Sequence, residues 1–155
     1  MFRSWFSRRW LGVILVVVLV SGFAAYAIGG NSYAVLRTAS GDHRIDVEIA
    51  DTPDERATGL MNRNSMPADH GMLFEFGESR PVTMWMKNTL IPLDMLFMDE
   101  DGKVTRIAVN ARPLSLALIP SGEPVRYVLE LNGGAAARYG AAVGDQLIHP
   151  AIQGE

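Results

Sequence analysis

Short apolar runs, separated by glycine, proline, asparagine and aspartate, restrict the fold of this chain more than any other feature. The clearest run is 43–50, where Ile45, Val47 and Ile49 alternate with polar residues. Alternation with a period of two is typical of a β-strand with one buried face. Further strands are predicted at 33–38, 72–76, 82–87, 93–98, 103–109, 125–131 and 146–149. The chain is therefore expected to be mainly β.

Two short helices interrupt these strands. Thr52 can cap a helix that begins at Pro53 and runs to about residue 62, and Glu55 completes a capping box. A second helix is predicted over 135–139, after a pair of glycines. With seven or eight short strands and two short helices, we expect a compact antiparallel sandwich or barrel.

The first 27 residues form a separate segment. Three arginines within the first nine residues precede an apolar run at 11–20 and an A-x-A motif at 25–27, as in a secretory signal. No charged residue follows until Arg37, so the same segment is also long enough to remain as a membrane anchor. Both alternatives leave the arginines inside and export a single domain, 28–155. We expect an extracytoplasmic protein, in the periplasm or on the outer face of the inner membrane.

Charge and cysteine content exclude several kinds of partner and site. All 17 acidic residues lie in 28–155, together with 11 of the 14 basic residues, so this part has a net charge of −6. An acidic domain without a basic stripe has little affinity for phosphate backbones, and we expect no nucleic-acid partner. The absence of cysteine excludes disulfides and thiolate metal sites.

A series of uncommon motifs follows the first predicted helix. They are Arg56 with Gly59-Leu60-Met61, Gly71-Met72-Leu73-Phe74, Met84-Trp85-Met86-Lys87-Asn88-Thr89, Ile91-Pro92-Leu93-Asp94 with Phe97, Val128-Leu129-Glu130-Leu131-Asn132 with Gly134, and Gly144-Asp145. In this order they resemble the family called domain of unknown function 192 (DUF192), over roughly 47–147. The resemblance implies a mainly β, sandwich-like fold outside the cytoplasm. It implies no reaction and therefore no catalytic residues.

Charged residues embedded in these apolar motifs are the candidate site. They are Arg56, Lys87, Asp94 and Glu130, with Asn88 and Trp85 beside them. One interpretation is structural: an unpaired buried carboxylate is costly, so Asp94 pairs with Arg56, and Glu130 is the next partner for that arginine. The other interpretation places these residues in a polar binding cleft beside Trp85, where Asp94 or Glu130 would act as acid or base in an enzyme.

Methionines suggest a second kind of site. Seven of the eight lie between Met61 and Met98, and Met84 and Met86 flank Trp85. Thioether sulfurs suit Cu(I), but methionine also fills irregular cores, and no histidine lies near Met84 in the sequence. We expect Met84 and Met86 to face the core, and we expect no metal or other cofactor.

Two functional classes remain open. The favoured one is a non-catalytic binding or accessory module of the cell envelope that contacts a small ligand, a glycan or an envelope protein. The alternative is a small hydrolase or a Cu(I)-handling protein that uses a cleft near Trp85 and Asp94. Enzymatic activity is not the expectation.

Overall fold

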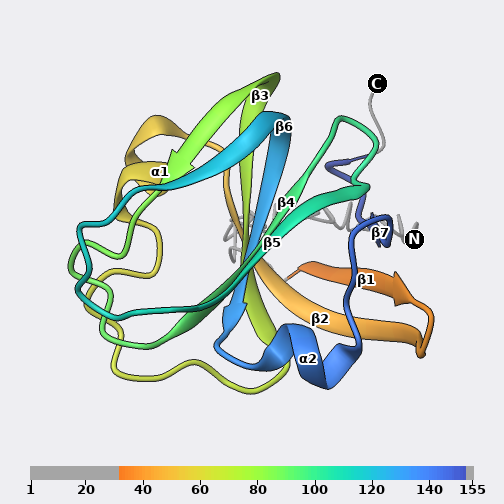
Figure 1. The fold of residues 1–155 in the computed structure, drawn as a ribbon, viewed down its shortest axis with the longest axis horizontal. Helices are drawn as coiled ribbons and strands as arrows, with labels where there is room; N and C mark the ends of the chain where they lie inside the picture. Colours follow the sequence, from red (N-terminus) through yellow and green to blue (C-terminus); the bar gives the residue numbers. More distant parts are fainter. Residues whose placement is uncertain (1–31, 153–155) are drawn as a thin grey trace, which may run out of the picture.

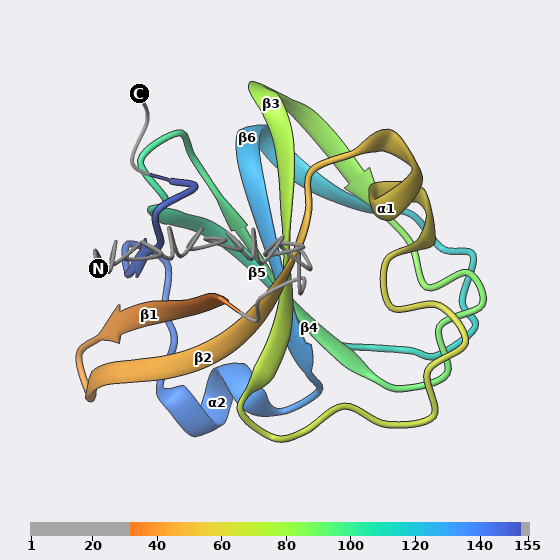
Figure 2. The same cartoon turned by 180° about the vertical axis from the view of Figure 1, so that it is seen from behind.

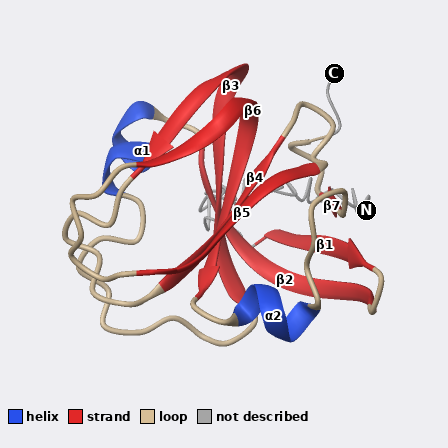
Figure 3. Cartoon of the chain, viewed as in Figure 1, coloured by secondary structure: helices blue, strands red, loops and turns tan. Residues whose placement is uncertain are grey.

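The computed structural model describes residues 32–152, and the predicted signal or anchor at 1–27 lies outside this range. The elements are β1 (Ser32–Thr38), β2 (Gly41–Ala50), α1 (Pro53–Thr58), β3 (His70–Met84), β4 (Leu93–Met98), β5 (Val104–Ala111), β6 (Ile119–Asn132), α2 (Ala135–Tyr139) and β7 (Gln146–Ile148). The mainly β class is confirmed, as are the number of strands and the two short helices (Figure 3). No helix within 32–152 combines the length and hydrophobicity needed to span a bilayer.

The seven strands form one strongly curved sheet, a half-barrel, in the order β5-β4-β6-β3-β2-β1-β7 (Figure 1). One neighbouring pair departs from the expected antiparallel pattern: β2 and β3 are parallel, with Asp46 opposite His70 and Ala50 opposite Phe74. A parallel pair needs a crossover of a dozen or more residues, and residues 51–69, including α1, provide it. The sheet is therefore mixed.

Strands β3 and β6 are longer than predicted and bend together. The expected strand 72–76 and the first half of the expected strand 82–87 belong to the single strand β3, which ends at Met84, so 85–87 lie in the loop that follows. The pairing of β3 with β6 shifts register between Glu75 and Arg80. Gly77, at a φ of 77°, lies in this irregular stretch. Ser121 Oγ accepts a hydrogen bond from the Val82 amide and donates one to the Glu123 carbonyl. The bend carries the far ends of β3 and β6 toward α1, as the front and back views show (Figure 2).

Helix α1 begins as predicted but ends four residues early. Thr52 and Glu55 form both hydrogen bonds of the capping box, and Pro53 is the first helical residue. Gly59, at a φ of 48°, ends the helix, and Asn62 also has a positive φ, so the chain turns away there. Leu60 is buried by this turn rather than by the helix itself.

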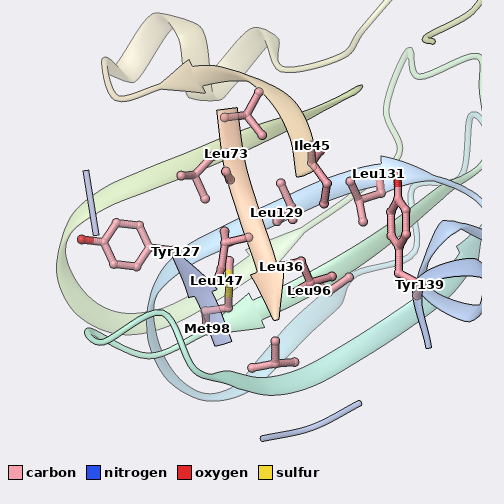
Figure 4. Close-up of a cluster of buried hydrophobic side chains, with 14 of the residues drawn as sticks. Leu36, Ile45, Leu73, Leu96, Met98, Tyr127, Leu129, Leu131, Tyr139 and Leu147 are labelled. Carbon is pink, nitrogen blue, oxygen red and sulfur yellow. The ribbon is translucent and has the colours of Figure 1, made fainter. Parts of the chain in front are cut away.

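Both faces of the sheet are covered, which creates two cores. The first core includes Leu36, Ile45 and Leu129 and is closed by α2 and β7 (Figure 4). The second core, on the other face, includes Phe74, Met95 and Val128, and the turn after α1 adds Leu60 to it. All six residues of β4 are buried because neither face of that strand meets solvent.

Candidate functional site

The site is a pocket of about 120 Å³ between α1 and the second-core face of the sheet, referred to below as the α1 pocket. Its lining comes from α1 and the following turn, from β3 on both sides of its bend, from the loop after β3 and from β6. The lining residues are Arg56, Ala57, Thr58, Gly59, Leu60, Met61, Phe74, Phe76, Thr83, Met84, Trp85, Thr89 and Glu130. Three of the six predicted binding residues, Arg56, Trp85 and Glu130, therefore line one pocket.

Glu130 is the most unusual group in this pocket. It is only 4% exposed, and no described residue donates a hydrogen bond to its carboxyl group. Its cross-strand neighbours are Met72 on β3 and Met95 on β4, both buried in the second core. Burial among these apolar side chains raises the pKa of Glu130 to about 8. The carboxyl group is thus mostly neutral at pH 7.

Arg56 lies at the pocket wall but forms neither of the ion pairs predicted for it. Its Nη1 donates hydrogen bonds to the carbonyl oxygens of Asp51 and Glu75, which ties α1 to β3. Its guanidinium carbon lies 5.9 Å from the centre of the Phe76 ring. The predicted Arg56–Asp94 pair is wrong: Arg56 lines the α1 pocket, whereas the Asp94 carboxylate bonds to the amides of Asn110 and of Ala136 in α2.

Asp94 lies outside the α1 pocket and has a structural role. Its Oδ1 accepts a hydrogen bond of 2.7 Å from the Asn110 amide, and its Oδ2 accepts one of 2.8 Å from the Ala136 amide. The second bond caps the amino-terminal end of α2, whose own N-cap is Gly134. Two amide donors, rather than an arginine, therefore compensate the burial of this carboxylate.

Lys87 and Asn88 lie beside the pocket in the loop after β3. Lys87 Nζ is 5.1 Å from the centre of the Trp85 ring, a cation–π distance, and Trp85 is 46% exposed. The Asn88 carbonyl accepts a hydrogen bond from the Asn62 amide, which joins this loop to the turn after α1. Both residues thus form the surroundings of the pocket rather than its lining.

The loop after β3 and the loop that follows β5 form an exposed apolar surface. The Met86 amide bonds to the Ser115 carbonyl, and the Leu114 amide bonds to the Thr89 carbonyl, so the two loops lie side by side. Their exposed apolar residues are Trp85, Leu90, Leu114, Leu116 and Leu118. We call this set the apolar loop pair.

The two methionines singled out by the sequence occupy different environments. Met86 is fully buried in the second core, which confirms the core prediction for this residue. Met84, the last residue of β3, is half-buried: it packs against the second core and also lines the α1 pocket with Met61. Within 32–152, no three histidine or acidic side chains lie together as a metal site.

Sequence reasoning did not identify the apolar lining of the pocket. Phe74, Phe76, Leu60 and Met61 read as ordinary core residues, and only the crossover from β2 to β3 brings them together. Glu130 itself carried a usable signal, since it is the only charged residue in the predicted strand 125–131 apart from Arg126. The sequence left open whether this acid is paired in the core or lines a cleft, and the structure places it, buried, in the lining of the α1 pocket.

The pocket lining contains few ionisable groups. Arg56 and Glu130 are the titratable groups of the pocket lining, and the lining contains no histidine. Ser40 Oγ lies 2.9 Å from His43 Nε2, but this pair joins the turn after β1 to the start of β2 and does not line the α1 pocket.

Comparisons with known proteins identify relatives of the same fold. The model of DUF192, described as "Uncharacterized ACR", matches residues 35–149. A crystal structure of a proposed transcription regulator from Sinorhizobium meliloti 1021 is 55% identical, with a TM-score of 0.74, over 76% of this chain and 92% of that one. A protein of unknown function from Novosphingobium aromaticivorans DSM 12444 is 39% identical, also with a TM-score of 0.74, over 76% of this chain and 84% of its own. No curated protein matches significantly.

Proposed function

This chain belongs to the DUF192 family, whose function is unknown, and we propose that it is a non-catalytic binding module of the cell envelope with its ligand in the α1 pocket. One observation carries the proposal: Glu130 is buried, has no hydrogen-bond donor among the described residues, and lines a pocket. Burying a polar group without a partner costs roughly 1–3 kcal/mol. A ligand that supplies the missing hydrogen-bond partner recovers this free energy when it binds.

The envelope location rests on the amino-terminal sequence. Three arginines followed by an uncharged apolar run favour export of the domain, either with cleavage after Ala27 or with a retained anchor. A reporter that is active only in the cytoplasm, fused after Glu155, is expected to be inactive. Activity of that reporter would contradict export, and amino-terminal sequencing separates cleavage from anchoring.

Three other functions are less well supported. DNA binding, suggested by the description of the S. meliloti relative, conflicts with the net charge of −6 in residues 28–155. Cu(I) handling has Met61 and Met84 in its favour, since both line the pocket. Hydrolysis has the least support, because a single acid and a guanidinium are the ionisable groups of the lining.

Native mass spectrometry tests the proposal directly. The full chain, purified from its own cells, is expected to carry a bound mass that Glu130→Leu removes, because leucine cannot hydrogen-bond the ligand. The control is Glu100→Gln, which changes an exposed acid outside the pocket lining. A mass retained by Glu130→Leu, or no mass in the unmodified protein, would count against the α1 pocket as the site. A bound copper ion would support the metal alternative instead.

A further inference from the structure

We propose that the α1 pocket binds a small zwitterion, with an ammonium group on Glu130 and a carboxylate on Arg56. This inference rests on the proposed function and specifies its ligand. It depends on which groups the pocket lining offers a ligand, and on how the size of the pocket limits the molecule.

Two buried side chains of the pocket lining offer hydrogen-bond acceptors once the Glu130 carboxyl group is ionised. Glu130 and Thr89 are 4% and 5% exposed, and both line the pocket. The Thr89 hydroxyl donates its hydrogen to the Lys87 carbonyl, so its oxygen remains available as an acceptor. An ammonium group carries three donors and a positive charge, and charge-assisted hydrogen bonds to a carboxylate are the strongest available. Glu130 and Thr89 therefore favour a protonated amine.

Arg56 gives the pocket lining a cationic group. Arg56 uses Nη1 for two backbone carbonyls, and its Nε and Nη2 donate to no other described residue. Two further cations lie on the aromatic residues of the lining: Arg80 is 5.2 Å from the centre of the Phe76 ring, and Lys87 is 5.1 Å from that of Trp85. These cations would repel a simple amine, whereas they would attract a carboxylate on the same molecule. A zwitterion carries both an ammonium group for Glu130 and a carboxylate for Arg56.

The pocket volume and the apolar walls restrict the rest of the molecule. About 120 Å³ is well below the roughly 300–1,000 Å³ of pockets that hold drug-sized ligands, so the pocket favours a small molecule. Leu60, Met61, Phe74 and Met84 lie along the walls. A short amino-carboxylic acid with a hydrocarbon link between its charged groups matches this lining.

Isothermal titration calorimetry of the full chain in a non-ionic detergent can test the charge requirement. The probes are β-alanine and L-alanine as zwitterions, with propionate lacking the amine and n-propylamine lacking the carboxylate. At least one zwitterion is expected to bind ten times more tightly than both single-charge analogues. Equal binding of either analogue, or no binding of any probe at millimolar concentration, would overturn the inference.

Substitutions and the pH dependence of binding test which residue contacts the ammonium group and which contacts the carboxylate. Glu130→Gln keeps the shape but cannot ionise, so it should weaken zwitterion binding at least tenfold, and Glu100→Gln should leave it unchanged. Arg56→Gln should weaken the zwitterion and propionate but not propylamine. Binding to the unmodified protein should release a proton, because Glu130 must ionise to bind the ammonium group. The affinity should therefore rise with pH between pH 6 and 8. Arg56 is the other titratable group that lines the pocket. Unchanged affinity in Glu130→Gln, or affinity that falls over this pH range, would contradict the assignment.

Failure of this inference is distinguishable from failure of the proposed function. If the purified protein carries a mass that depends on Glu130 while no zwitterion binds, the pocket is a binding site for another ligand class. If neither the mass nor any probe is found, both proposals are wrong.

Discussion

At the scale of single residues, Glu130 links stability to pH in an unusual direction. Burial raises its pKa to about 8 from the ordinary value of 4.5, so between these values the folded state holds a proton that the unfolded state has lost. The contribution of Glu130 to the free energy of unfolding therefore falls as pH rises from 4.5 to about 8, and then levels off. By pH 7 the loss amounts to roughly 3 kcal/mol.

Glu130→Gln should remove this pH dependence, because the amide does not titrate. We expect the variant and the parent to have similar stability at pH 4.5 and the variant to be more stable by roughly 3 kcal/mol at pH 7. Urea denaturation at both pH values measures the difference. Other carboxylates with lowered pKa values, such as Glu48 beside Arg63, also make the stability depend on pH. Their contribution is the same in both proteins, so it cancels when the two free energies of unfolding are subtracted. A variant less stable than the parent at pH 7 would show that a partner compensates Glu130 in the folded chain.

Asp94 shows the opposite solution to burying a carboxylate. It is fully buried, and its two oxygens accept the amides of Asn110 and Ala136. Asp94→Ala leaves both amides without their acceptor and should cost about 3 kcal/mol in the free energy of unfolding. Arg56→Ala should not reproduce this cost through Asp94, because the two residues do not pair. A double-mutant cycle measures this: coupling above about 0.5 kcal/mol between Arg56 and Asp94 would contradict the structure.

At the scale of elements, α1 is a six-residue helix that depends on its cap. An isolated helix of this length is unstable in water, so local capping and the contacts of Arg56 must hold it. Thr52→Ala removes the hydroxyl that accepts the Glu55 amide and should lower the free energy of unfolding by about 1 kcal/mol. Thr52→Ser keeps a hydroxyl and is the matched control. Equal losses in the two variants, measured by urea denaturation, would show that the cap contributes nothing.

The pairing of β3 with β6 depends on the absence of a side chain at Gly71. A Cβ atom there would lie 2.7 Å from the Glu130 carbonyl oxygen and 2.9 Å from Leu131 Cδ2. The backbone oxygen cannot move without disturbing the ladder, so Gly71→Ala should cost about 2–3 kcal/mol. Thermal unfolding of the variant measures the loss, and a cost below about 0.5 kcal/mol would contradict this close approach.

At the scale of the whole molecule, one sheet serves two cores, and the apolar loop pair belongs to neither. Leu114, Leu116 and Leu118 are 60–70% exposed, so the folded state gains little from them. Replacing all three with serine should change the free energy of unfolding by less than about 0.5 kcal/mol per site. Chemical denaturation of the triple variant checks this, and Leu129→Ser, in the first core, is the contrasting control because it should cost several kcal/mol. A large loss in the triple variant would show that the loops are buried.

The sequence by itself determined the local elements of this protein. The alternation at 43–50 predicted β2, and the Thr52-Pro53-Glu55 pattern predicted the start of α1. The two faces of β4 also follow from the strand period: Leu93, Met95 and Phe97 lie in the second core, and Leu96 and Met98 in the first. These features depend on backbone periodicity and on capping groups a few residues apart, which a single sequence contains.

Only the tertiary structure decided the partners of the buried charges. The parallel pairing of β2 with β3, the amide donors on Asp94 and the lack of a donor on Glu130 depend on segments far apart in the chain. An apolar strand carrying a carboxylate predicts that the acid needs compensation, but two amides, an arginine or a ligand would all provide it. Which of them does so depends on what covers each face of the sheet, and long-range packing sets that cover.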